Sequence, residues 1–399
     1  MQLSNRQLFL LHNAQTSTSP LMLEAEKAEG SIIYDIHGKE YIDLISGISV
    51  SNIGHRHPKV LKAIDHQLQK YMHLMVYGEY IQTPQTLLAK YINDLLIADF
   101  NGPVSTYFTN SGAEAVEGAM KLAKRYTGRS NFIACNQAYH GHTHGPMSLM
   151  SDEQYRKTFS PLLPGVKFIN HNSLENIDYI DETVAAVFIE IVQAETGYIP
   201  AEMAFLEAIY MQCKKTGALL IIDEIQTGCG RTGSLFAFQK TQIKPDVLLL
   251  AKGFGGGMPI GAFIASNQVM NSLSENPILG HLTTFGGHPV CCASALATLQ
   301  VIVEENLMEQ ATIKGKYIHE YIKKHLAIET EGLGLMQSIT FKNFDTCKLI
   351  IDTCLENGIL TDWFLFSSNK LRISPPLNIE TSLLEKALAT LVAIVKKYI

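Results

Sequence analysis

Short, uninterrupted apolar runs that end next to a charged residue restrict the fold of this 399-residue chain more than any other feature. The clearest are residues 218–222, which end at Asp223, and residues 247–250, which are followed by Ala251 and Lys252. Short runs that are apolar throughout are typical of strands buried on both faces of a sheet. Helical patterns separate these runs. We therefore expect an α/β fold with a mostly parallel central sheet covered by helices.

The same reading gives an expected order of elements and a division into domains. We expect helices at 59–71, 86–96, 113–126, 204–216 and 290–306, and strands at 105–109, 132–135, 185–192, 218–223, 247–250 and 262–265. Short strands are expected within 31–50, around a turn at 35–39. The chain is longer than one ordinary core, which predicts two domains. The larger would span 56–289, and residues 1–55 and 290–399 would form a smaller α/β domain.

Charge, hydropathy and cysteine usage exclude several classes of partner. A net charge of −6 gives no reason to expect nucleic acid or an anionic membrane surface. The apolar runs are too short to span a bilayer, and no basic cluster precedes the apolar residues 8–11, so we expect no secretory signal. The seven cysteines show no paired metal-ligand spacing. They predict buried free thiols, no metal site and a cytoplasmic location.

Asp223 and Lys252 are the main candidates for chemistry. Ligands of parallel α/β sheets lie beyond the carboxyl ends of the strands, where both residues fall. An amine and a carboxylate at neighbouring strand ends suit pyridoxal phosphate, because the amine forms a Schiff base and the carboxylate keeps the pyridine nitrogen protonated. The competing readings are a surface lysine and a helix-capping aspartate. Residues 251–261 contain five glycines, but Pro259 follows where a dinucleotide site would open a helix, so we discount such a site.

Two hydroxyl-containing segments offer a place for a phosphate group. Ser111, Gly112 and Ala113 join an expected strand to an expected helix. Backbone amides at a helix start attract anions, helped by the helix dipole. Thr283 and Thr284 precede two bare glycines and add hydroxyl groups. Each segment alone is weak evidence, because many such junctions bind nothing.

Three further side chains are candidates for contacts with a cofactor ring or a substrate. Gln226 follows Asp223 at the start of a glycine-rich loop and lies near enough to bond a phenolic oxygen of the ring. Tyr139 follows an expected strand and offers a flat side chain for stacking, although a lone tyrosine is more often a core residue. Arg372 lies among apolar neighbours. It suits either a structural acidic partner or a substrate carboxylate.

In these motifs the chain resembles the class III aminotransferases, which are pyridoxal phosphate enzymes of fold type I. The likeness is greatest to the acetylornithine and ornithine aminotransferases. It extends from residues 47–58 to residues 371–377, and its most specific parts are 223–233 and 251–253. The resemblance implies a fold type I transferase that binds pyridoxal 5'-phosphate. It also implies a homodimer with active sites shared between the subunits.

The resemblance assigns the cofactor contacts residue by residue. Lys252 matches the lysine of the Schiff base, Asp223 the partner of the pyridine nitrogen, and Gln226 the residue beside the ring hydroxyl. Gly112 and Ala113 match the turn that binds the phosphate, and Tyr139 matches the aromatic residue stacked on the ring. Thr284 matches a threonine that reaches the phosphate from the second subunit.

The resemblance also assigns the substrate contacts. Glu195 matches a glutamate that pairs with the carboxylate-binding arginine, here Arg372, and swings aside in ornithine-type members when an α-carboxylate binds. Thr283 would face the substrate. His142 stands where acetylornithine-type and ornithine-type enzymes have a second arginine for a substrate carboxylate. Histidine is a weaker and pH-dependent ligand for that group.

The expected reaction transfers an amino group from an ω-amine such as acetylornithine or ornithine, as in arginine biosynthesis, to 2-oxoglutarate as the default acceptor. One alternative keeps the fold and changes the reaction to that of an aminomutase or a decarboxylating enzyme. The former needs no added oxo acid, and the latter releases carbon dioxide. Another alternative is a binding protein without catalysis, which would be expected to lack Lys252 or Asp223.

Overall fold

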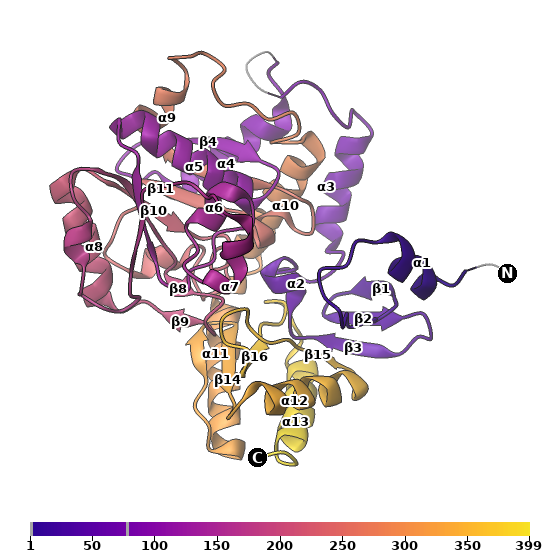
Figure 1. The fold of residues 1–399 in the computed structure, drawn as a ribbon. Helices are drawn as coiled ribbons and strands as arrows, with labels where there is room; N and C mark the ends of the chain where they lie inside the picture. The colour runs from indigo at the N-terminus through magenta and orange to yellow at the C-terminus, as the bar shows by residue number, and fades with distance from the viewer. Residues whose placement is uncertain (1–2, 77–79) are drawn as a thin grey trace.

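The computed structural model describes residues 3–76 and 80–399 and is centred on a seven-stranded sheet of order β4-β12-β11-β10-β7-β5-β6 (Figure 1). Its strands are β4 (Val104–Thr109), β5 (Asn131–Cys135), β6 (Val166–Ile169), β7 (Val184–Ile189), β10 (Leu219–Asp223), β11 (Val247–Leu250) and β12 (Gly261–Ser266). Five neighbours, from β11 to β6, run parallel. Only β12 is antiparallel to the strands beside it, β11 and β4. The predicted mostly parallel sheet is confirmed.

Helices on both faces of this sheet bury alternate residues of each strand. Leu219 and Ile221 of β10 belong to a buried cluster that includes residues of α5 (Gly112–Thr127). Leu220 and Ile222 belong to a second cluster that includes residues of α8 (Met203–Thr216) and α10 (Pro289–Glu304). The strand is therefore apolar from Leu219 to Ile222, because neither of its faces meets water there.

The remaining helices are of two kinds. Longer ones are α3 (Pro58–Leu68), α4 (Thr83–Leu96), α11 (Leu307–Leu326), α12 (Phe344–Glu356) and α13 (Thr381–Val395). Short ones are α1 (Asn5–His12), α2 (Ser46–Ser49), α6 (His144–Ser148), α7 (Glu153–Arg156) and α9 (Asn267–Met270). Among the described residues no single helix has the length and apolar content to cross a membrane; α10 and α11 meet that test only as a pair, bent by 64°.

Both ends of the chain contribute to one small sheet. Its order is β1 (Ala25–Glu29), β2 (Ile32–Asp35), β3 (Glu40–Asp43) and β15 (Ile359–Leu360), with β15 parallel to β3. A third sheet contains β13 (Glu331–Leu333), β14 (Met336–Thr340) and β16 (Lys370–Ile373). Figure 1 shows β14, β15 and β16 with α11, α12 and α13 at the lower end of the molecule, and β1, β2 and β3 to the right of them. We propose that the two chain ends form the smaller domain. Because α10 packs against α3 and α4, we place its boundary after α10.

Some expected elements differ from the structure. The strand expected at 185–192 is divided into β7 and β8 (Val192–Gln193), and β8 pairs with β9 (Ile199–Pro200). The break falls at Glu190, whose carboxylate accepts the amide hydrogens of Tyr139 (3.3 Å) and Ala194 (3.1 Å). Residues 46–49 form α2 and not a strand, and β6 was not expected. The seven cysteines are free and buried, as predicted.

Candidate active site

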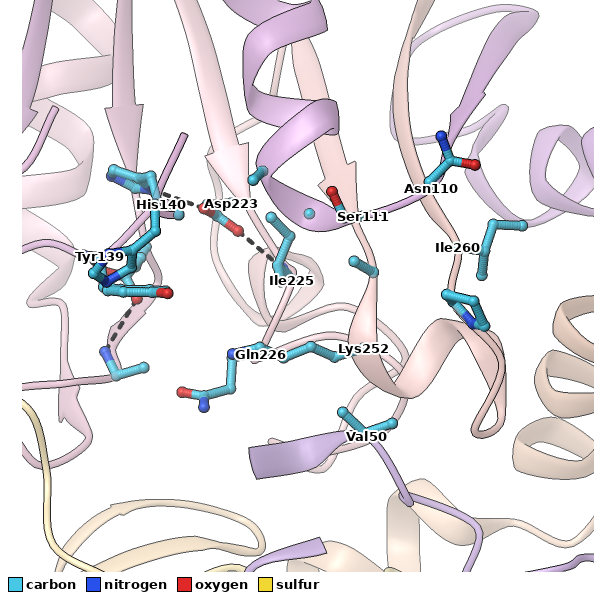
Figure 2. A pocket seen from close by; sticks show the side chains of 18 of the residues that line it. Val50, Asn110, Ser111, Tyr139, His140, Asp223, Ile225, Gln226, Lys252 and Ile260 are labelled. Atoms are coloured by element: carbon cyan, nitrogen blue, oxygen red, sulfur yellow. Dashed lines mark hydrogen bonds and ion pairs between the residues drawn. The ribbon is translucent and has the colours of Figure 1, made fainter. Parts of the chain in front are cut away.

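A cavity of about 600 Å³ lies at the carboxyl ends of β10 and β11 (Figure 2). Its size suits a small organic cofactor or substrate. Most of the residues expected at the site line it: Ser111, Gly112, Ala113, Tyr139, His142, Glu195, Asp223, Gln226 and Lys252. Thr283, Thr284 and Arg372 are not among its lining residues. The structure thus brings together nine residues that are distributed over more than a hundred positions of sequence.

Asp223 ends β10 and is fixed by two partners. Its Oδ1 accepts the amide hydrogen of Ile225 (2.9 Å), and His140 Nδ1 donates to its Oδ2 (2.7 Å). Figure 2 shows both contacts at the edge of the cavity. The side chain is 4% exposed, so these bonds act in surroundings of low polarity and hold the carboxylate in one orientation.

His140 is a functional residue that the sequence reasoning missed. It is buried, and its ring is packed 5.8 Å from the ring of Phe188. Burial alone would lower the pKa of His140, but the hydrogen bond to Asp223 and the charge of that carboxylate raise it. A raised pKa favours a proton on the ring, which in turn stabilises Asp223 as an anion. The sequence feature that could have indicated His140 is its position between Tyr139 and Gly141, in a segment already selected because of its tyrosine.

Lys252 begins the short helix that follows β11, η4 (Lys252–Gly255), and has a positive φ of 48°. Within the described residues its amine has no hydrogen-bond or ion-pair partner. Burial is the largest influence on the pKa of Lys252, and the pKa is lowered from its ordinary value although Glu195 and Asp223 act in the opposite direction. A lowered pKa increases the share of neutral amine, which is the nucleophilic and basic form.

The start of α5 forms an anion-binding turn beside the cavity. Ser111 caps the helix, and its Oγ accepts the amide hydrogen of Glu114 (3.2 Å). The amides of Gly112 and Ala113, in the first turn, cannot bond within the helix. Both residues line the cavity. A Cβ on Gly112 would lie 2.9 Å from the side chain of Ile225, so a larger residue at this turn would require that side chain to move.

Gln226 provides the test of whether these residues fit a ligand. Its side chain is buried and lines the cavity, yet neither amide atom has a hydrogen-bond partner among the described residues. Buried polar atoms are rarely left unpaired without a reason such as a bound molecule. Gln226 therefore has both a donor and an acceptor available for a polar group in the cavity.

Glu195 and Arg372 form a buried ion pair at the edge of the cavity. Arg372 Nη2 lies 3.2 Å and 3.3 Å from the two carboxylate oxygens, and Leu365 donates its amide hydrogen to Oε2 (3.1 Å). Burial alone would raise the pKa of Glu195, but the charges of Arg372 and Lys252 and the hydrogen bonds from Leu365 and Arg372 together lower it. Glu195 lines the cavity whereas Arg372 does not. The acid therefore separates the arginine from the cavity.

The two threonines and His142 lie at the periphery. Asn110 Nδ2 donates to Thr283 Oγ1 (3.1 Å), which links Thr283 to a residue of the cavity wall. Thr284 is exposed, and within 3–76 and 80–399 its one hydrogen bond joins its carbonyl oxygen to His73 Nε2 (2.9 Å). His142 is exposed, with its ring 5.3 Å from that of Tyr139. Thr284 therefore does not reach the cavity of its own chain.

Comparison with known proteins decides the family. The sequence profile of "Aminotransferase class-III" matches residues 13–395. The chain belongs to the class III aminotransferases. An acetylornithine aminotransferase from Archaeoglobus fulgidus is 38% identical over 377 residues, which are 94% of this chain and 96% of that relative. A putrescine aminotransferase from Pectobacterium atrosepticum is 38% identical over 365 residues, 87% and 76% of the two chains.

Solved structures of class III aminotransferases agree with the fold. An ornithine aminotransferase from Toxoplasma gondii superposes with a TM-score of 0.89 at 27% identity, covering 99% of this chain and 95% of that one. A Bacillus anthracis aminotransferase gives a TM-score of 0.90 at 26% identity, covering 99% and 100%. Class III aminotransferases use pyridoxal 5'-phosphate. The amine of Lys252, the unpartnered amide of Gln226 and the turn at Gly112 all open onto one cavity, which fits that cofactor. The predicted fold type, enzyme class and cofactor are confirmed.

Proposed function

We propose that this aminotransferase takes its amino group from an ω-amine and passes it to 2-oxoglutarate. The observation that carries the proposal is the arrangement of Glu195 in the cavity wall with Arg372 buried behind it. With the pair closed, the cavity presents a carboxylate, which attracts the positively charged end of an amine donor. With Glu195 turned away, Arg372 becomes available to a substrate carboxylate, for which its planar guanidinium is suited. Acetylornithine, ornithine and putrescine are the donors to test first.

We assign the holding of the cofactor to residues of this chain by their position at the cavity. When bound, pyridoxal 5'-phosphate supplies a carbonyl carbon that takes up the amino group and a ring that accepts electrons. Asp223, supported by His140, holds the ring nitrogen in its protonated form. We assign the ring oxygen to Gln226 and the ring face to Tyr139. The phosphate is assigned to the turn formed by Ser111, Gly112 and Ala113.

Proton transfer is assigned to Lys252. Lys252 Nζ would hold the cofactor through a covalent bond; once displaced by the substrate amine, it would take the proton from the substrate carbon that bears the amino group and give it to the cofactor carbon that receives that group. Burial lowers the pKa of Lys252 and so increases the share of neutral amine that can act as a base. Among the described residues that line the cavity, Lys252 is the single lysine.

We propose that the enzyme works as a homodimer with shared sites. Thr284 is exposed and lies in a segment whose large apolar side chains also face outward: Ile278 (74% exposed), Leu279 (59%), Leu282 (57%) and Phe285 (55%). Exposed apolar residues this numerous mark a surface of association. A second copy would cover them and allow Thr284 to reach the cofactor phosphate in the partner's cavity.

The test of the donor uses holoenzyme and no acceptor. Protein loaded with pyridoxal 5'-phosphate is mixed with single amines, and a substrate is recognised by the loss of the absorbance of the lysine-bound cofactor. Acetylornithine, ornithine or putrescine should bleach it and yield the oxo product, and Lys252→Ala, the control, should release no oxo product. Full conversion of the amine without any oxo acid would support an aminomutase instead, and release of carbon dioxide a decarboxylating enzyme.

The acceptor is tested through His142. An imidazole nitrogen offers the carboxylate of 2-oxoglutarate a single hydrogen bond, whereas an arginine in its place would offer a bidentate ion pair. If pyruvate were preferred over 2-oxoglutarate, and His142→Arg restored 2-oxoglutarate, the proposed acceptor would be wrong. We expect 2-oxoglutarate to be preferred and His142→Arg to bring no gain, because the Glu195–Arg372 pair is retained.

A further inference from the structure

Tyr198 lies on the same tight loop as Glu195 and reaches the same arginine from another side. The loop connects β8 to β9, and the amide hydrogens of Gly197 and Tyr198 both bond the carbonyl oxygen of Ala194 (3.2 Å each). Arg372 Nη1 donates to Tyr198 Oη (3.1 Å), and that hydroxyl lies 3.3 Å from Ser374 Oγ, to which it donates. The phenol oxygen therefore accepts a hydrogen bond from the guanidinium, and the phenol hydrogen is donated to the serine.

The backbone at Tyr198 shows that this placement is enforced by its surroundings. Tyr198 has a φ of +61° and follows Gly197 at +100°. Bulky residues rarely adopt the left-handed region, because Cβ meets the neighbouring carbonyl oxygen. Ser338 Oγ holds the carbonyl oxygen of Gly197 (2.8 Å), and the tyrosine ring is completely buried. Such a conformation persists only where the contacts around it over-determine it.

Phe364 completes a cradle for the guanidinium. The centre of its ring lies 4.4 Å from the guanidinium carbon of Arg372, and it meets the ring of Tyr198 edge-on at 4.7 Å and 87°. Both aromatics belong to a small buried cluster and do not line the cavity. Of the three groups that hold the guanidinium, only Glu195 is therefore in a position to turn into the cavity.

We propose that Tyr198 is a positioning residue that keeps Arg372 in place after Glu195 turns away, and so selects substrates that carry a carboxylate. This inference rests on the proposed function, in which Arg372 receives that carboxylate. Without the phenol, the departure of Glu195 would leave the guanidinium with no hydrogen-bond acceptor among its present side-chain partners. A mobile arginine must be ordered again by each substrate, and that ordering weakens binding.

Tyr198→Phe tests the inference, because it removes the hydroxyl and keeps the buried ring. Two quantities are measured: the KM and kcat for 2-oxoglutarate in the half-reaction that consumes it, and the Kd of glutarate, a dicarboxylate that has no oxo or amino group and cannot react. Loss of one charge-assisted hydrogen bond predicts that the KM and the Kd rise about tenfold to a hundredfold. The kcat, and the KM of a donor without a carboxylate such as putrescine, should change less than about twofold.

The matched control is Tyr41→Phe. Tyr41 is also buried, and its phenol donates to a carboxylate, Asp35 Oδ2 (3.2 Å), in the small sheet away from the cavity. It should leave the Kd of glutarate unchanged. A second variant, Phe364→Leu, removes the ring face beneath the guanidinium and should raise the same Kd, so the inference remains testable if Tyr198→Phe folds poorly.

Three results would overturn the inference. The first is an unchanged Kd of glutarate in Tyr198→Phe. The second is an equal rise of the KM for donor and acceptor, which indicates a general loss of structure. The third is absence of glutarate binding in the wild-type protein. The glutarate comparison does not depend on turnover, so a wild-type enzyme that accepts none of the expected amines would refute the proposed function and still leave this result readable.

Discussion

Replacing His140 by phenylalanine isolates what the histidine contributes to Asp223. The carboxylate has two partners in the structure, His140 Nδ1 at 2.7 Å and the amide of Ile225 at 2.9 Å. Phenylalanine keeps a ring of similar size against Phe188 and removes only the first of these bonds. Asp223 then loses its charged partner and retains the neutral one, so a protonated ring nitrogen on the cofactor would be less well stabilised.

The expected magnitude follows from the kind of bond that is lost. A hydrogen bond that involves a charged group is typically worth about 1.5–3 kcal/mol. The His140 side chain is fully buried and that of Asp223 is 4% exposed, so water cannot replace the bond easily. About 2 kcal/mol corresponds to roughly thirtyfold. We expect the rate of the amine half-reaction to fall about tenfold to a hundredfold, with a smaller loss of cofactor affinity.

The assay is rapid mixing of holoenzyme with its donor, followed by the absorbance of the bound cofactor. His171→Phe is the matched control: His171 also packs against a phenylalanine ring, Phe205 at 5.5 Å, but its Nε2 has no partner among the described residues. The control should retain the wild-type rate. A loss below about threefold in a folded, cofactor-saturated His140→Phe protein would refute the reasoning, as would an equal loss in the control.

Three further predictions concern separate parts of the molecule. Lys252→Ala should bind pyridoxal 5'-phosphate and fail to transfer amino groups; a near wild-type rate would contradict the role of Nζ. Mixed Lys252→Ala and Thr284→Ala chains should recover more activity than the sum of the parents, and no recovery despite proven subunit exchange would argue against shared sites. Burial raises the pKa of Glu224 from 4.5 to about 7, so the folded state retains a proton that the unfolded chain releases, and stability should fall by about 3 kcal/mol as the pH rises from about 4.5 to 7. Burial also raises the pKa of Glu190 to about 7, so Glu224→Gln should remove the Glu224 share, about 3 kcal/mol, and leave that of Glu190. Urea unfolding of both proteins at several pH values measures this difference, and an unchanged slope would show that Glu224 is not a source of it.

The parts of the fold that could be predicted are those with a strong local pattern. The predicted bounds of β11 agree with the structure at both ends. Its four residues are all aliphatic and buried, so the apolar run itself marks the strand. β6 was missed because it is an edge strand, and Lys167, exposed between apolar neighbours, breaks the run. The division of the strand expected at 185–192 depends on amides that come from elsewhere in the chain to Glu190. A sequence pattern contains no record of such partners.

The same difference separates the predicted from the unpredicted parts of the site. Asp223 and Lys252 were found because each follows an apolar run at a strand end. His140 was missed because its function depends on Asp223, which is 83 residues away in sequence. Tyr198 was missed because nothing in the sequence indicates a left-handed tyrosine beneath an arginine. Thr284, exposed in one chain, can be placed at a site only when a second copy is considered.

The pairing of β15 with β3 has a consequence for how the chain assembles. Ile359 lies beside Ile42, so the small sheet closes only after almost all of the polypeptide has been synthesised. Contacts between such distant segments slow folding, because a very large loop must be closed first. A nascent chain that ends before β15 already contains Asp223 and Lys252 but lacks β16 and its Arg372. The arginine proposed to bind a substrate carboxylate is therefore added only during the final stage of synthesis.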